Sequence, residues 1–240
     1  MASSSRAPTE PVSAQLRTVS PLWRTPRFLA ALASIVVGFA GGAVLADGVM
    51  ENADLSAFDP TVTADFIGVR TEVVTAVARA FTFVGSTAAL VPLTLGLIMI
   101  LLLRRRWGAA VAVAWGMSLS LTITVLLKSS IGRARPPAHD VLGAINNGFA
   151  FPSGHTLNGT VFVGLVAGLL LARCRTRWAR AVSVGVALAL AVGIGLSRVY
   201  LGYHWLTDVM AGWSLATGVL GTVVLACTLL DRRRLSRPRP

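Results

Sequence analysis

Six long apolar stretches separate the polar parts of this chain and restrict the folds open to it. A helix needs roughly 17–25 apolar residues to cross a bilayer core of about 30 Å, and each stretch reaches or approaches that length. The composition agrees, because 54% of the 240 residues are hydrophobic and 13% are charged, with a mean hydropathy of +0.70, as in membrane proteins. The sequence therefore predicts an all-α integral membrane bundle of six transmembrane helices. The predicted spans are 28–46, 86–103, 109–127, 156–172, 181–199 and 208–230.

The segment 62–83 has a helical apolar pattern but also carries four charged residues, Asp65, Arg70, Glu72 and Arg79. On insertion scales, one charge at the bilayer centre costs about 2.5–3.5 kcal/mol. We therefore expect an additional amphipathic helix that lies on the outer side, on the membrane surface or on the protein.

The arginines predict the orientation of the bundle. Sixteen of the 22 Lys and Arg residues lie in four segments, and a path of six spans places all four on one side. The positive-inside rule makes this side the cytoplasm, so both termini are expected there. Eight of the ten acidic residues fall on the opposite side. The four basic segments are 1–27, 104–106, 173–180 and 231–240.

The two chain ends, 1–27 and 231–240, are rich in Ser, Pro and Arg and are expected to be disordered basic tails around one domain, 28–230. The first span is expected to be a retained anchor. Val44 and Ala46 resemble a signal-peptide cleavage site, but the apolar run of about 19 residues exceeds a usual signal core of about 7–15.

The formal charge of +12 makes nucleic-acid binding an alternative. The basic residues lie between apolar runs and form no stripe with aromatic residues, so no nucleic-acid partner is predicted. Cys174 and Cys227 lack the spacing of a metal site and are interpreted as small packing residues. The sequence leaves the oligomeric state open.

Four helix ends on the predicted outer side carry ionisable residues, several of them basic where the positive-inside rule disfavours them. One such residue could be a snorkelling anchor, but several converging helix ends indicate a site. Lysine and arginine neutralise phosphate through charge-assisted hydrogen bonds, and the Ser153 and Gly154 N–H groups at a helix start suit an anion. His204 and Asp208 have i,i+4 spacing, so the carboxylate can orient the imidazole. The residues concerned are Lys128, Arg133 and Arg135 after the third span, His155 before the fourth, Arg198 after the fifth, and His204 and Asp208 before the sixth.

Three motifs in this region resemble the signature of the type-2 phosphatidic acid phosphatase superfamily, which also includes the vanadium haloperoxidases. They are KSSIGRARP (128–136), PSGH (152–155) and SRVYLGYHWLTD (197–208). They occur in the family order and at the expected helix ends. The resemblance covers roughly 86–230 and extends to the six spans of the membrane branch of the family.

The resemblance implies a role for each matching residue. His204 would attack phosphorus to give a phosphohistidine, and Asp208 would orient His204. His155 would protonate the leaving oxygen and then activate water. No metal or other cofactor is implied, and the sequence has no carboxylate cluster suited to magnesium. The residues implied to bind the phosphate oxygens are Lys128, Arg135, Ser153, Gly154 and Arg198.

We therefore expect a membrane phosphatase that removes the terminal phosphate of a lipid phosphate or diphosphate on the outer side of the cytoplasmic membrane. Prenyl diphosphates such as undecaprenyl diphosphate, phosphatidic acid and phosphatidylglycerol phosphate are candidate substrates. A haloperoxidase and a non-catalytic phospholipid-binding or transport protein are the alternatives. Whether Arg133 contacts a headgroup stays open, and His139 is interpreted as part of a solvated loop.

Overall fold

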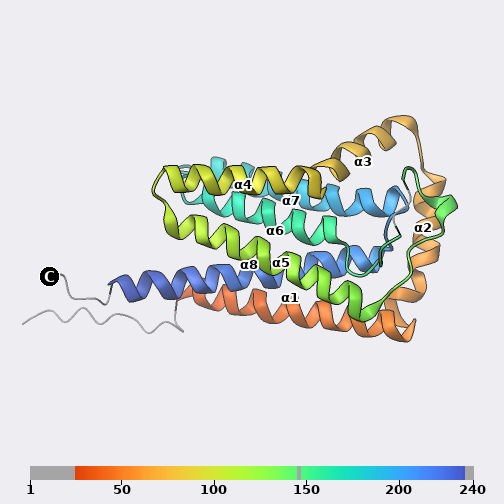
Figure 1. Cartoon of the computed structure of the whole chain (residues 1–240), viewed down its shortest axis with the longest axis horizontal. Helices are drawn as coiled ribbons and strands as arrows, with labels where there is room; N and C mark the ends of the chain where they lie inside the picture. Colours follow the sequence, from red (N-terminus) through yellow and green to blue (C-terminus); the bar gives the residue numbers. More distant parts are fainter. Residues whose placement is uncertain (1–24, 145–146, 236–240) are drawn as a thin grey trace, which may run out of the picture.

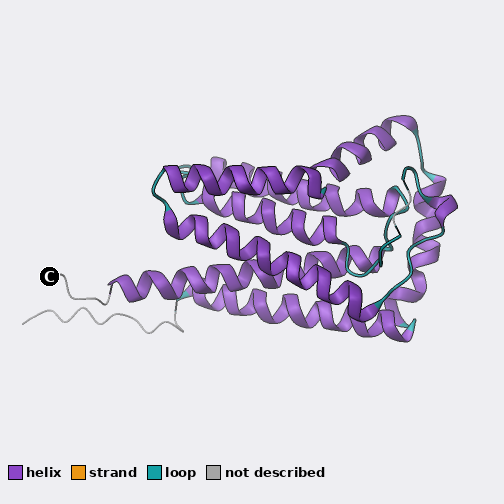
Figure 2. Cartoon of the chain, in the orientation of Figure 1, coloured by secondary structure: helices purple, strands orange, loops and turns teal. Residues whose placement is uncertain are grey.

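The computed structural model of the chain describes residues 25–144 and 147–235. Within these two ranges the structure is helical and contains no strand (Figure 2). The predicted tails fall largely outside the described residues. The α-helices are α1 (Pro26–Glu51), α2 (Asp59–Gly68), α3 (Glu72–Val84), α4 (Thr87–Leu103), α5 (Trp107–Ile131), α6 (Gly154–Leu171), α7 (Arg177–Tyr200) and α8 (Leu206–Leu235), with short 3-10 helices η2 (Asp54–Phe58) and η3 (Ala138–Asp140).

The long helices run alongside one another as a bundle (Figure 1). Five of the described helices, α1, α5, α6, α7 and α8, are long and apolar enough to cross a membrane. Helix α4 has 17 residues, or about 25 Å at 1.5 Å per residue, and it forms a sixth candidate span only together with α3, at a bend of 44°. The chain is therefore a multi-pass integral membrane protein, as predicted.

The segment expected to form one amphipathic helix over 62–83 is instead two helices, α2 and α3, which are separated by a break at 69–71. Arg70 lies in this break and donates to the backbone carbonyls of Asp140 and Tyr200 at 2.7–3.1 Å. The Thr71 side chain caps α3 by accepting from the Val74 N–H. A new helix start and the bonds of Arg70 thus account for the break.

Helix α6 lies at the centre of the core and packs against α5, α7 and α8. Its side chains Leu157, Val161 and Leu165 are buried against Leu215 and Val219 of α8. This cluster fixes the start of α6 next to the start of α8, and these two helix starts carry the second and third sequence motifs.

Glycines allow α1 to lie directly against α8. A Cβ atom on Gly38 would stand 2.2 Å from the backbone nitrogen of Gly218, far closer than two atoms can pack. Small residues of this kind let helix backbones approach closely within a membrane.

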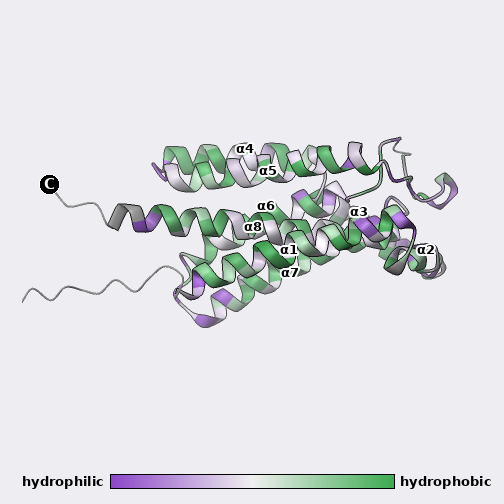
Figure 3. Ribbon diagram, turned by 90° about the horizontal axis from the view of Figure 1, so that it is seen from below, coloured by the Kyte–Doolittle hydropathy of each residue, from purple (hydrophilic) through white to green (hydrophobic). Residues whose placement is uncertain are grey.

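The two ends of the bundle differ in character. The arginine-containing links 104–106 and 172–176 lie at the end where α8 terminates, whereas η3 and the starts of α6 and α8 lie at the opposite end (Figure 1). Hydrophobic residues dominate the bundle between the two ends (Figure 3). The described arginine links therefore share one end, as a path of six spans predicts.

Candidate active site

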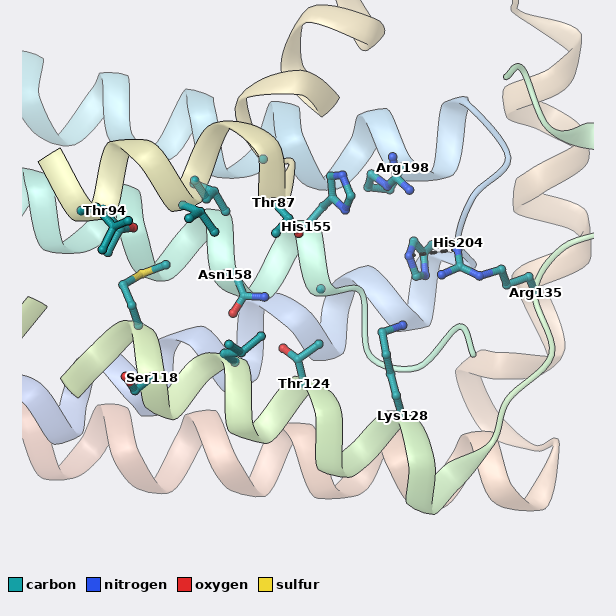
Figure 4. A pocket seen from close by; sticks show the side chains of 17 residues that line it. Thr87, Thr94, Ser118, Thr124, Lys128, Arg135, His155, Asn158, Arg198 and His204 are labelled. Carbon is teal, nitrogen blue, oxygen red and sulfur yellow. Dashed lines mark hydrogen bonds between the residues drawn. The ribbon is translucent and has the colours of Figure 1, made fainter. Parts of the chain in front are cut away.

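A pocket of about 410 Å³ lies between α4, α5 and α6. At one end it is lined by charged and histidine side chains from the ends of α5 and α7 and from the starts of α6 and α8 (Figure 4). The fold thus brings together six of the eight residues to which the family resemblance gives a role, and the other two, Ser153 and Asp208, lie directly behind them. The six residues that line the pocket are Lys128, Arg135, Gly154, His155, Arg198 and His204.

His204 is buried and is held on its Nδ1 side. This nitrogen lies 3.3 Å from Oδ2 of Asp208, and the same oxygen accepts from the Trp205 N–H at 3.0 Å. On the other side of the ring, Nε2 lies 3.4 Å from Nη1 of Arg135. Because α8 begins only at Leu206, the i,i+4 contact spans the start of the helix.

The electrostatic surroundings of His204 favour the neutral imidazole. Burial, followed by the positive charges of Arg198, Arg135 and Lys128, holds the pKa of His204 well below its usual 6.5. A carboxylate at Nδ1 favours the tautomer that carries its proton there. The lone pair is then on Nε2, the nitrogen that faces the cations.

The three cations come from the ends of different elements. Lys128 is in the last turn of α5, Arg198 is in the last turn of α7, and Arg135 follows α5 in the loop. Burial lowers the pKa of Arg135, but an arginine stays charged at physiological pH. Three positive charges around one pocket form a site for an anion.

Backbone carbonyls bind two of these cations. Arg135 donates to Gly148 at 2.5 Å and to Tyr203 at 2.7 Å. The ammonium group of Lys128 donates to the carbonyls of Phe149 and Ala150. The loop before PSGH therefore lies over Lys128 and Arg135 and supplies oxygen acceptors to them.

Arg198 is held differently. Its Nη1 donates to the Thr82 hydroxyl of α3 at 2.9 Å, and its guanidinium lies 4.1 Å from the centroid of the Tyr203 ring. Its Nε is buried and has no partner among the described residues.

The PSGH segment differs in part from the expectation. The Ser153 N–H is not free for an anion, because it donates to the Asp208 carbonyl at 3.0 Å, and the Ser153 hydroxyl accepts from Thr156 at 2.9 Å. Gly154 and His155 begin α6, and first-turn N–H groups have no acceptor within their own helix. The expected helix-start donors thus begin one residue later.

Two residues to which the sequence analysis gave no role, Arg133 and Asp59, contact Asp208 or its partner. Arg133 Nη1 donates to Asp208 Oδ1 at 2.6 Å, and Arg133 Nη2 donates to Asp59 Oδ2 at 2.7 Å. Arg133 thus takes part in an internal ion pair, while its contact with a headgroup stays an open question. Asp59 starts α2, and the only sequence signal for it was an acidic residue before a proline.

Among residues 25–144 and 147–235, no group of three or more His, Cys, Asp or Glu side chains is arranged to hold a metal ion. The expectation that the site works without a metal stays a prediction.

Comparison with known proteins identifies the class of this fold and site. The family model of the PAP2 superfamily matches residues 109–232, so the chain belongs to that superfamily, as its three motifs predicted. It has the fold of a PAP2-type membrane lipid phosphate phosphatase. No match was found among curated proteins.

Two solved structures resemble the chain. One is a transmembrane PAP2-type phosphatidylglycerolphosphate phosphatase from Bacillus subtilis, with a TM-score of 0.70 and 25% identity over 86% of this chain and 99% of that one. The other is LpxE of Aquifex aeolicus, with a TM-score of 0.49 and 18% identity over 73% of this chain and 95% of that one.

Proposed function

We propose that the protein hydrolyses the terminal phosphate of a lipid phosphate or lipid diphosphate through a phosphohistidine, on the extracytoplasmic face of the membrane. The observation that carries the proposal is the position of His204. Its Nε2 faces the pocket beside Arg135, while Asp208 holds the other nitrogen.

In the first step, Nε2 of His204 attacks phosphorus and forms an N–P bond while the bond to the leaving oxygen breaks. Lys128, Arg135 and Arg198 stabilise the negative charge of the phosphoryl oxygens. His155, which lines the same pocket, gives its proton to the leaving oxygen.

In the second step, the neutral His155 takes a proton from water as the hydroxide attacks phosphorus. The N–P bond breaks, inorganic phosphate leaves, and both histidines return to their starting states. The same residue serves as acid and then as base, as in other two-step hydrolases.

The rest of the pocket supports a lipid as substrate. Beyond the cations it continues between α4 and α5, where most of its lining is apolar (Figure 4). A headgroup phosphate could lie among the cations while an attached chain extends between these helices. A soluble phosphate ester would leave this part of the pocket unused. The apolar lining residues include Leu90, Val91, Leu95, Met117 and Leu121.

The distribution of charge supports an outward-facing site. The described arginine links lie at the end of the bundle opposite to the start of α8, which directly follows the link 201–205 that contains His204. The positive-inside rule assigns such arginine links to the cytoplasm.

Similarity to the Bacillus subtilis protein, a phosphatidylglycerolphosphate phosphatase, makes phosphatidylglycerol phosphate one of the first substrates to test. Phosphatidic acid and prenyl diphosphates such as undecaprenyl diphosphate belong in the same panel. The oligomeric state stays open.

The test is release of inorganic phosphate by purified protein from each lipid in mixed micelles, with the His204→Gln variant as the control. We expect release from at least one lipid by the wild type and none by the variant. Tight binding of lipid phosphates without any release would instead support a non-catalytic lipid-binding protein.

A further inference from the structure

A second group of buried charges lies behind His204, on the side away from the pocket. Arg133 donates to Asp208 and Asp59, and neither Arg133 nor Asp59 is among the described residues that line the pocket. We propose that Arg133 and Asp59 are positioning residues, which hold Asp208 and through it the nucleophile His204. This inference rests on the proposed function.

The contacts of Asp208 explain why Arg133 is needed. Oδ2 of Asp208 is occupied by His204 and the Trp205 N–H, whereas Oδ1 receives Nη1 of Arg133 at 2.6 Å. A carboxylate that is bonded at both oxygens has a fixed plane. Arg133 therefore helps to fix the orientation of the Asp208 carboxylate, and with it the direction in which Oδ2 faces His204.

Asp59 in turn holds Arg133. Its Oδ2 accepts from Nη2 of Arg133 at 2.7 Å and also from the Thr207 hydroxyl, while its Oδ1 accepts from the Thr207 N–H at 3.0 Å. The Thr207 hydroxyl accepts from Nη1 of Arg133 at 2.8 Å. Arg133, Thr207 and Asp59 thus form a closed ring of hydrogen bonds beside Asp208.

The ring is shielded from water. The exposed side-chain fractions are 0% for Asp208, 2% for Asp59 and 14% for Arg133, and Arg133 also lies 5.7 Å from the Trp205 ring centroid. Removing one partner of a buried ion pair leaves an uncompensated charge, so each member depends on the others.

Arg133 also favours the reactive tautomer of His204. A buried carboxylate without a cationic partner tends to take up a proton. A protonated Asp208 could donate to Nδ1 of His204, which would move the imidazole proton to Nε2 and remove the attacking lone pair. The groups that face Asp208 are Arg133, His204, the Trp205 N–H and, at longer range, Lys128.

Asp59 lies outside residues 109–232, the part of the chain that the family model matches. The N-terminal part of the chain therefore contributes to the site through η2 and α2, besides anchoring the bundle through α1. A deletion or replacement of α2 would then reduce catalysis although every motif residue remained.

The test compares kcat, KM and the pH profile of the wild type with those of Arg133→Gln, Arg133→Lys and Asp59→Asn. Arg70→Gln is the matched control, because Arg70 joins the same region to Tyr200 and Asp140 and does not contact Asp208. Monodispersity and thermal stability in detergent identify variants that fail to fold.

We expect Arg133→Gln to lower kcat about 100-fold with little change in KM. In a Ser-His-Asp triad, replacing the carboxylate that contacts the histidine lowers kcat by about 10⁴-fold. A smaller loss is expected here because Arg133 acts on His204 only through Asp208. The acid limb of kcat/KM should move to higher pH, since activity requires an ionised Asp208. Arg133→Lys, which keeps the charge, should recover part of kcat.

Asp59→Asn should lower kcat about 10-fold, and the double variant with Arg133→Gln should be no worse than Arg133→Gln alone, because Asp59 acts through Arg133. Arg70→Gln should keep the wild-type kcat and acid limb. If Arg133→Gln does not fold, the proposal is tested with Arg133→Lys and Asp59→Asn alone.

The proposed positioning role of Arg133 and Asp59 is contradicted if their folded variants keep the wild-type kcat and acid limb. It is also contradicted if these variants change both quantities only as much as Arg70→Gln does. A wild type that releases no phosphate from any lipid would instead contradict the proposed function itself, and the inference with it.

Discussion

Asp208 contacts His204 at Nδ1, at a distance of 3.3 Å, and both side chains are buried. This contact leaves only Nε2 of the imidazole facing the pocket. Burial, and then the surrounding cations, favour the neutral ring, and a proton on Nδ1 beside Asp208 would leave the lone pair on Nε2, the nitrogen that faces the pocket. The geometry therefore favours a nucleophile over a residue that merely binds an anion.

The role of His204 predicts a covalent intermediate. We expect His204→Gln to lower phosphate release by more than about 10⁴-fold, the scale seen when the nucleophile of a hydrolase is removed. Acid-labile labelling from a radioactive phosphate ester should appear on the wild type and disappear in the variant. The control is His139→Gln, because His139 is an exposed loop histidine with a side chain 80% exposed. Equal labelling of both variants would remove His204 from the mechanism.

The pH dependence should reflect the lowered pKa of His204. Burial, and then Arg198, Arg135 and Lys128, lower this pKa from 6.5, so Nε2 stays unprotonated until the pH falls well below that value. We expect the acid limb of kcat/KM, which reports the free enzyme, below pH 6.5. Bound phosphate adds negative charge beside the ring and favours the imidazolium.

The acid limb of kcat should therefore lie at higher pH than that of kcat/KM. Both profiles come from initial rates of phosphate release across the acid range. An acid limb of kcat/KM at or above pH 6.5 would contradict the assignment of His204.

Helix α3 should influence phosphate binding through one hydrogen bond. Thr82 accepts from Nη1 of Arg198 at 2.9 Å, and a hydrogen bond to a charged group contributes about 1.5–3 kcal/mol. We expect Thr82→Val to lower kcat/KM about 10-fold, mainly by raising KM. Thr75→Val is the matched control, because Thr75 is also on α3 but contacts Tyr200. Similar kinetics for the two variants would show that Thr82 has no separate role.

The charge balance of the site predicts how it responds to inhibitors. Three cationic side chains line the pocket with two histidines, so vanadate, which resembles phosphate in charge and shape, should inhibit competitively. Chelators should leave phosphate release unchanged. Activity that is lost with a chelator and restored by magnesium would mean that the cations do not stabilise the charge alone.

The sequence predicted the bundle and most of the candidate site because both follow from short-range patterns. Apolar runs of sufficient length define spans, and residues at successive helix ends on one side must lie near each other. The position of Lys128 at the end of α5 and that of His155 at the start of α6 could be inferred in this way without knowledge of packing.

The Arg133–Asp59 pair could not be inferred in that way. The two residues are separated by 74 positions and meet only because α2 docks against the start of α8. The break between α2 and α3 has a local signal in the sequence. Gly68 followed by Thr71 has the order of a helix stop and a new helix cap.

The side of the membrane that carries the site is the last prediction. Trp178 is 79% exposed at the start of α7, in an arginine-rich segment, and Ala138 is exposed in η3 at the opposite end. We expect an impermeant thiol reagent on intact cells to label Ala138→Cys and not Trp178→Cys, both in a Cys174→Ser, Cys227→Ser background. Permeabilised cells should be labelled at both positions, which controls for access.

Label at Trp178→Cys alone would invert the topology and move the reaction to the cytoplasmic face. Label at both positions in intact cells would mean that α6, the helix between them, does not cross the membrane. A miscount can also arise at the bend between α3 and α4, because α4 is a candidate span only when α3 is counted with it. If α3 and α4 did not cross, a five-span path with a cytoplasmic start of α1 would place the link 104–106 and Trp178 outside and Ala138 inside, so label at Trp178→Cys alone is also the result that a five-span path predicts.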